Sequence, residues 1–167
     1  MLAPWADICY FADAQWWKWH RKRQEFIDFK GQKCSIWASG NAIDDPAVHI
    51  LRNSNEPNHG NGLSLDAEKL VTGGNSGYQS LNLAVLAGAK TIILLGYDAR
   101  EPENGQPSHW FGDHPHKESL AAYPMYRKSF ADGAAAIKAA GVRVINCNLD
   151  SAITQFEKMG IDEALRL

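Results

Sequence analysis

The feature that most constrains the fold is a strand, a glycine-rich turn, a helix and a second strand that follow one another from Leu70 to Asp98. Gly73, Gly74 and Gly77 fall within five residues of the turn, where glycine lets the backbone turn sharply and approach a ligand closely. The helix that follows directs its free amide hydrogens and the positive end of its dipole toward the same position. This unit predicts a parallel α/β arrangement with a site for an anion such as a phosphate.

The turn differs from the common phosphate-binding motifs. It lacks the Lys-Ser/Thr pair of a Walker A loop, and it does not match G-x-G-x-x-G with a ribose-binding acid about 20 residues further on. A turn that only packs the helix against the sheet is the alternative interpretation. Side-chain donors on Asn75 and Ser76 favour ligand contact, because a packing turn does not need them. The candidate ligand contacts here are Gly73, Gly74, Asn75, Ser76 and Gly77.

Two predicted strands end at an acidic residue. The apolar run Ile8 to Ala12 is followed by Asp13, and the run Thr91 to Leu95 leads to Asp98. Ligands of open parallel sheets bind at the carboxyl ends of the strands, so Asp98 should face the same crevice as the glycine turn. Either carboxylate could hydrogen-bond ribose or sugar hydroxyls, hold a divalent cation, or cap neighbouring amides.

Strands and helices alternate along the rest of the chain. The apolar patterns predict helices over 14–29, 78–86 and 123–140, strands at 33–38, 48–51 and 142–146, and a last helix capped by Ser151 with Ile153 and Phe156 turned inward. This alternation predicts a three-layer α/β fold with a mostly parallel sheet and right-handed crossovers. No linker or shift in composition divides residues 1–167, so we expect a single domain.

A histidine cluster follows the strand that ends at Asp98. Three imidazoles and a carboxylate lie within the eight residues from His109 to His116. They could act as a general acid or base, bind a phosphate, or hold a metal, and the alternative is a solvated loop with incidental histidines. A metal is the weaker option, since ligands on one loop rarely close a site without a second element. His109, and then His114, are the candidates for proton transfer, with Asp98 beside them.

Aromatic and basic residues share the segment that follows Asp13. Trp16, Trp17 and Trp19 could stack on a base or sugar ring, although aromatic side chains at helical spacing more often form core. We retain Trp16 as a candidate ligand contact. The basic residues 21–23 are interpreted as a solvated face from which one side chain could reach a phosphate.

Composition narrows the class of protein. The chain has 17 Lys and Arg against 19 Asp and Glu, a formal net charge of −2, and no basic stripe, so we expect no constitutive nucleic-acid partner. Cys9, Cys34 and Cys147 are odd in number and far apart, which indicates reduced core thiols and an intracellular location. Neither a spanning apolar stretch nor a signal peptide is found, so we expect a soluble, cytoplasmic protein without a membrane partner.

Several strings of the chain resemble a family of uncharacterised tailed-phage and prophage proteins, and the resemblance spans nearly the whole sequence. If it holds, the cytoplasm concerned is that of the host cell. The strings are those at 3–7, 13–17, 73–77, 82–84, 94–98 and 109–115.

More remotely, the order of the serine-glycine loop, the helix, the strand ending in Gly-x-Asp and the strand before Ser151 is similar to a Rossmann-like superfamily. That superfamily contains bacterial sialyltransferases that use CMP-sugars, motility accessory factors and pterin diphosphokinase-like proteins. The resemblance implies ligand contacts at Asn75, Ser76 and Gly77 and a proton-transfer role for His109 or His114. The superfamily usually opens with a βα unit, whereas the first candidate strand here begins at Ile8. Either the start is truncated relative to those proteins, or the sheet edge is completed by another subunit in a homo-oligomer.

Together these features predict a phage-type enzyme that binds a nucleotide or nucleotide-sugar and transfers a glycosyl or phosphoryl group. The cofactor is unknown, and a divalent cation is compatible with the acids but not indicated. One alternative is a non-catalytic binder of a nucleotide or nucleotide-derived signal, in which no histidine is needed for turnover. Another is a structural or assembly protein of a virion.

Overall fold

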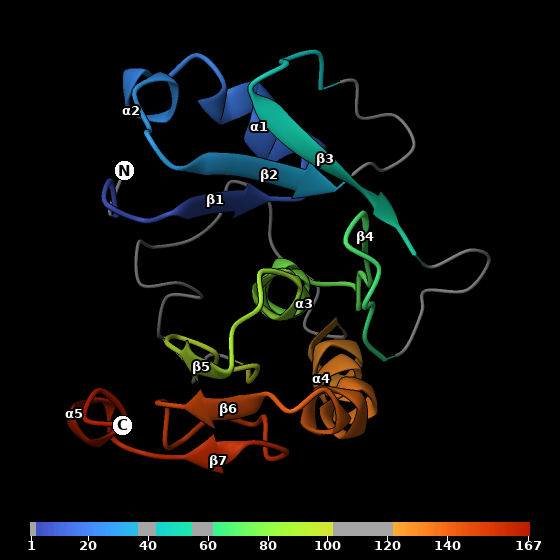
Figure 1. The fold of residues 1–167 in the computed structure, drawn as a ribbon, viewed down its shortest axis with the longest axis vertical. Coiled ribbons are helices and arrows are strands. Elements are labelled where there is room, and N and C mark those ends of the chain that lie inside the picture. Colours follow the sequence, from blue (N-terminus) through green and yellow to red (C-terminus); the bar gives the residue numbers. More distant parts are fainter. Residues whose placement is uncertain (1–2, 37–42, 55–61, 102–121) are drawn as a thin grey trace.

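The computed structural model describes residues 3–36, 43–54, 62–101 and 122–167, and these form an α/β fold with two all-parallel sheets (Figure 1). In the first sheet the strands lie in the order β1-β2-β3-β4, with Tyr10 of β1 opposite Cys34 of β2. In the second sheet the order is β5-β6-β7. The strands are β1 (Ile8–Phe11), β2 (Gln32–Ile36), β3 (Val48–Asn53), β4 (Lys69–Leu70), β5 (Thr91–Leu94), β6 (Arg143–Asn146) and β7 (Glu157–Lys158).

Helix α3 (Ser76–Leu86) lies between the two sheets and joins them (Figure 1). Leu83 and Leu86 pack against the cluster of β1–β4 that contains Cys34 and Leu70, both buried. Other buried residues of the helix, Leu81 among them, belong to the cluster that contains the inward side chains of β5 and β6. The α/β class and the parallel strands agree with the sequence prediction, but the sheet is in two parts because α3 buries apolar side chains against both.

The outer faces of the sheets are covered by short helices. Helices α1 (Ala14–His20) and α2 (Gln24–Ile27) place Trp17 and Phe26 on Phe11 of β1. Helix α5 (Ile161–Ala164) packs Ala164 with Ile145 on the second sheet. The long helix α4 (Ala122–Ala139) adds Phe130 and Ile137 to the cluster around α3.

The single helix predicted over 14–29 is wrong. Helix α1 ends at His20, and Arg23 is extended, with φ −76° and ψ 136°, before α2 begins. The break lets Phe26 turn back onto the rings of Phe11 and Trp17, at centroid distances of 5.9 and 5.8 Å. Packing of three aromatic rings therefore overrides the helical periodicity of this segment.

The last predicted helix, capped by Ser151, is also wrong. Ser151 Oγ instead donates a hydrogen bond of 2.6 Å to the carbonyl oxygen of Tyr97 and accepts one of 3.0 Å from the Ile153 amide. Ile153 and Phe156 are turned toward the core as expected, but they lie on irregular chain that leads to β7. Ser151 therefore closes a local turn with Ile153 and also ties the chain after β6 to the end of β5, and no helix begins there.

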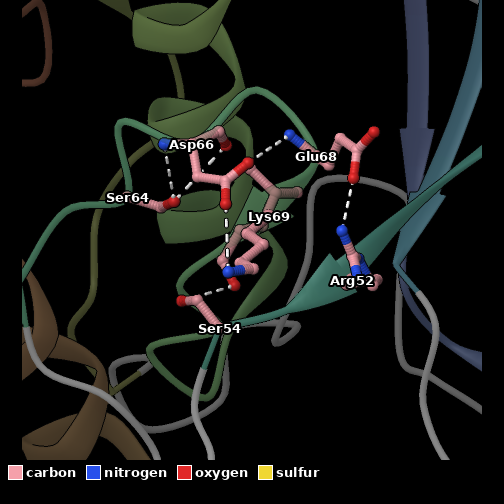
Figure 2. A network of polar contacts seen from close by, with 7 residues as sticks. Arg52, Ser54, Ser64, Asp66, Glu68 and Lys69 are labelled. Atoms are coloured by element: carbon pink, nitrogen blue, oxygen red, sulfur yellow. Dashed lines mark hydrogen bonds and ion pairs between the residues drawn. The ribbon is translucent and has the colours of Figure 1, made fainter.

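A polar network joins side chains of β3, β4 and the connection between them, directly before the glycine turn (Figure 2). Asp66 accepts hydrogen bonds from the Glu68 amide at 3.0 Å and, as an ion pair, from Lys69 Nζ at 3.0 Å. These two contacts, the amide first, hold the pKa of Asp66 below its ordinary value. Ser54 Oγ donates to the carbonyl oxygen of Leu70 at 3.1 Å, so the end of β3 is tied to β4 directly before the turn.

Candidate functional site

A cavity of about 400 Å³ lies where the amino end of α3, the chain after β5 and the first turns of α4 meet. A larger hollow of about 600 Å³ between α4 and β6–β7 is lined mainly by small and apolar side chains and contains none of the predicted site residues. The first cavity is lined by Asn75, Ser76, Gly77, Ser80, Gly96, Tyr97, Asp98, Ala99, Arg100, Tyr123, Tyr126, Phe130 and Ile153.

One wall of this cavity is the amino end of α3. Ser76 and Gly77 are its first two residues, so their amide hydrogens have no acceptor within the helix. Asn75 is the cap: its Oδ1 accepts a hydrogen bond of 2.7 Å from the Tyr78 amide. The exposed Ser76 adds a hydroxyl group beside the two amides. This wall therefore offers hydrogen-bond donors and a positive helix end to an anion.

The preceding turn shapes this wall without lining the cavity. Gly73 and Gly74 have φ of 53° and 71°, in the left-handed region that favours glycine. A Cβ at Gly73 would lie 2.5 Å from the Tyr78 ring, and Ser129 Oγ donates a hydrogen bond of 2.5 Å to the Gly73 carbonyl oxygen. The close packing fixes the direction in which α3 begins. Of the five predicted turn residues, three line the cavity and these two hold its shape.

A second wall carries the carboxylate of Asp98. Its Oδ1 accepts a hydrogen bond from Asn148 Nδ2, and its carbonyl oxygen accepts one of 2.8 Å from the Ala152 amide. The preceding carbonyl, that of Tyr97, is held by Ser151 Oγ and by Nδ2 of the fully buried Asn146 at 3.4 Å. The chain after β6 thus fixes both the backbone and the side chain of Asp98.

Aromatic side chains form a third wall. Tyr97 Oη donates a hydrogen bond of 3.1 Å to the Gly77 carbonyl oxygen, which links the chain after β5 to the first turn of α3. Burial raises the pKa of Tyr97 to about 12 from the ordinary value of 10.0, so the hydroxyl stays protonated and remains a donor well into alkaline pH. Tyr123 and Tyr126 meet edge to face at 6.0 Å on the first turn of α4. The cavity therefore combines apolar ring surface with the polar groups of the other two walls.

The structure brings together some of the predicted site residues and separates others. Asn75, Ser76, Gly77 and Asp98 share one cavity. Asp13 caps α1 instead, since its Oδ1 accepts a hydrogen bond of 2.7 Å from the Gln15 amide. Trp16 stacks on Phe11 at 4.7 Å within the core of the first sheet. Neither Asp13 nor Trp16 lines the cavity, and His109 and His114 lie outside the described residues.

Sequence reasoning missed Tyr123, Tyr126 and Asn148. The sequence pattern predicts the two tyrosines only as part of a long helix over 123–140, although two aromatic residues near its amino end are an available signal. Asn148 carries no signal in the sequence, because its role depends on the proximity of β6 to the end of β5, which pair in parallel.

Metal and membrane features are absent from the described part of the chain. No group of three His, Cys, Asp or Glu side chains gathers there as a metal site would need. None of the described helices has both the length and the apolar character needed to cross a bilayer. All three cysteines are free thiols, and Cys34 is buried.

Comparisons with models of protein families, with curated proteins and with solved structures find no match to this chain.

Proposed function

We propose that the cavity at the amino end of α3 binds a nucleotide or a nucleotide-sugar. The observation that carries this proposal is the convergence of three kinds of group on one space: the amides of Ser76 and Gly77, the carboxylate of Asp98 and the rings of Tyr123 and Tyr126. The amides suit a phosphate, the carboxylate suits hydroxyl groups, and the aromatic rings suit a planar base or a sugar ring. Arg100 at the same cavity adds a positive charge for the anionic ligand.

We further propose that the protein is a phage-type enzyme that transfers a glycosyl or phosphoryl group. In that reaction the amino end of α3 stabilises the negative charge of the phosphate, Asp98 orients hydroxyl groups, and His109 or His114 moves the proton. The competing hypotheses are a binder without turnover and a virion protein that binds no small molecule. One set of measurements distinguishes the three hypotheses.

The proposal is tested first by binding. Mass spectrometry of ligand retained by gently purified protein, and a thermal-shift screen of nucleotides and of CMP-, UDP- and GDP-sugars, should identify a ligand. A ligand that binds only the folded state adds about 2.7 kcal/mol of apparent stability at a hundredfold excess over its dissociation constant. If none of these compounds raises the melting temperature and none is retained, the binding proposal is wrong, and co-purification with particles would favour the virion protein.

A variant of the helix end separates ligand binding from folding. Ser76→Asp places a negative charge on the first residue of α3, where it interacts favourably with the helix dipole, by about 0.3–1 kcal/mol, but repels a phosphate. We expect the free protein to keep or slightly raise its melting temperature while the shift caused by a nucleotide is lost. Gln32→Glu is the matched control, because it adds the same charge at an exposed position on β2, outside the cavity.

Turnover is tested separately. If the wild type forms product from a nucleotide-sugar or a nucleoside triphosphate, and His109→Ala or His114→Ala abolishes product without loss of ligand affinity, the enzyme hypothesis is supported. If the wild type binds a nucleotide, forms no product, and the double histidine variant binds equally well, the protein is a binder.

A further inference from the structure

The hydrogen bond between Asn148 and Asp98 fixes the orientation of the carboxylate at the cavity. Asn148 reaches Asp98 from the chain after β6 and donates from Nδ2 to Oδ1. Its own Oδ1 accepts a hydrogen bond of 3.0 Å from the Asp150 amide, and its amide donates one of 3.0 Å to Asn146 Oδ1. Asn148 is therefore fixed at three points, and it presents Asp98 in one orientation.

An Asp98 side chain held in this way still has acceptor capacity. A carboxylate accepts hydrogen bonds with both oxygens at about four lone-pair positions and donates none. One of those positions is used by Asn148, and Asp98 is exposed to the cavity that it lines. The group can therefore accept hydrogen bonds from paired donors on a ligand, and two neighbouring hydroxyl groups of a sugar are such donors.

The surroundings of Asp98 favour hydroxyl groups over a divalent cation. Mg²⁺ or Ca²⁺ requires several oxygen ligands, usually with more than one carboxylate or with phosphates. Asp98 is the one carboxylate among the described residues that line the cavity, and its nearest side-chain partner is an amide hydrogen donor, which would face a cation unfavourably.

We propose that the Asn148–Asp98 pair recognises the vicinal diol of a sugar, so that the cavity prefers ribonucleotides to 2′-deoxyribonucleotides. This inference rests on the proposed function, since the diol belongs to a ligand whose phosphate lies at the amino end of α3. Asp98 is the group that contacts the diol, and Asn148 is a positioning residue that holds it. A hydroxyl that hydrogen-bonds a charged group contributes about tenfold or more to affinity.

The experiment compares matched ligands. The four ribonucleoside monophosphates and their 2′-deoxy counterparts are titrated against the full-length chain, with affinities measured by calorimetry and inorganic phosphate as the ligand without a sugar. We expect at least one ribonucleotide to bind about tenfold or more tightly than its 2′-deoxy counterpart. Equal affinities for every pair overturn the diol proposal and leave nucleotide binding intact. If neither a mononucleotide nor a CMP-, UDP- or GDP-sugar binds, the proposed function fails and the diol proposal fails with it.

Two isosteric variants and their combination identify the residues. Asp98→Asn removes the charge, and Asn148→Asp keeps the acceptor for the Asp150 amide but sets two carboxylates against each other. Each variant should bring the ratio of the affinities for a ribonucleotide and its 2′-deoxy counterpart toward one. The affinity for inorganic phosphate should stay as in the wild type. The combined D98N/N148D protein restores a donor and an acceptor between the two positions, so we expect its melting temperature to recover without recovery of the ribose preference. A single variant that retains the full preference would contradict the proposal.

Discussion

Arg127 of α4 donates a hydrogen bond of 3.0 Å from Nη1 to the carbonyl oxygen of Ala99, the residue that follows Asp98. Ala99 has φ of 48°, and among the described residues it is the one non-glycine residue in the left-handed region. That conformation costs a residue with a side chain on the order of 1–2 kcal/mol. A contact from α4 therefore holds a strained residue beside the candidate site, where strained backbone is often found.

Substitutions of Ala99 should report this strain. Ala99→Gly removes the steric cost of the left-handed conformation, which offsets the greater chain entropy of glycine, so we expect a free energy of unfolding equal to or about 1 kcal/mol above that of the wild type. Ala99→Val should lower it by about 1–2 kcal/mol, because a β-branched side chain crowds the same conformation. Urea unfolding measures both. Equal stability of the two variants would show that the backbone of residue 99 is not held in the left-handed conformation.

A glycine within α4 should resist replacement by alanine. A Cβ at Gly133 would lie 1.8 Å from the hydroxyl oxygen of Tyr78 and 2.8 Å from its Cζ. Helix propensity alone predicts that Gly133→Ala stabilises the protein by about 1 kcal/mol. We expect the opposite sign, a loss of about 2 kcal/mol or more, because Tyr78 is buried and cannot move aside.

The cause can be isolated by combining this change with Tyr78→Phe. Removal of the hydroxyl relieves the closest contact, so Gly133→Ala should cost less in the Tyr78→Phe background than in the wild type. Thermal unfolding of the four proteins gives the coupling energy between the two positions. Additive effects would mean that the hydroxyl does not set the requirement for glycine.

Asn82 should be among the most sensitive polar positions of the chain. Its side chain is fully buried on α3, accepts hydrogen bonds of 3.1 Å from the amides of Ser64 and Val71, and donates one of 2.9 Å to the Ser64 carbonyl oxygen. Asn82→Leu leaves these three backbone groups without that partner, which should cost about 3–5 kcal/mol of unfolding free energy.

Gln155→Leu is the control for Asn82. That amide also forms two side-chain hydrogen bonds, both to Thr154, but it is exposed, so water replaces them and the loss should stay within about 0.5 kcal/mol. Urea unfolding of both variants measures the difference. Similar losses in the two would contradict a special role of the buried Asn82.

The sequence predicted the elements whose pattern is local. Apolar runs identified β1, β5 and β6, and the run from Tyr78 to Leu86 identified most of α3, because burial on both faces leaves a continuous apolar signal. The division into two sheets could not be predicted, since it depends on which sides of α3 bury Leu83 and Leu81. Tertiary contacts likewise decided the break at Arg23 and the role of Ser151.

For the candidate site, the sequence predicted the wall formed by the amino end of α3, and it predicted Asp98 but not Asn148 of the second wall. The glycine turn and Asp98 could be placed together because the carboxyl end of a strand and the amino end of the preceding crossover helix meet at one edge of a parallel sheet. The tyrosines of α4 and the amide of Asn148 reach that edge only through packing between elements far apart in the sequence. Their contribution is a property of the assembled fold.

Buried tyrosines should make the protein sensitive to alkali. Burial raises the pKa of Tyr78 and of Tyr97 to about 12 from the ordinary value of 10.0, and it raises the pKa of Tyr10 as well. Between pH 10 and 12 the unfolded chain loses these protons while the folded chain keeps them. The folded state then binds more protons, so the free energy of unfolding falls as the pH rises through this range.

Burial also raises the pKa of the Cys9 and Cys34 thiols above the ordinary value of 9.0, so urea midpoints measured between pH 8 and 12 should begin to decline near pH 9 and fall more steeply above pH 10. Tyr97→Phe removes one titrating group, together with the hydrogen bond to Gly77, so it should be less stable at pH 8 yet show a shallower decline above pH 10. Ile153→Val is the comparison, because it removes buried apolar contact but no titrating group, so it should lower the stability and leave the slope unchanged. A decline that is equally steep in the Tyr97→Phe protein would mean that this hydroxyl is ionised as readily in the folded state as in the unfolded one, and hence that the wall between Tyr97 and Gly77 is open to water.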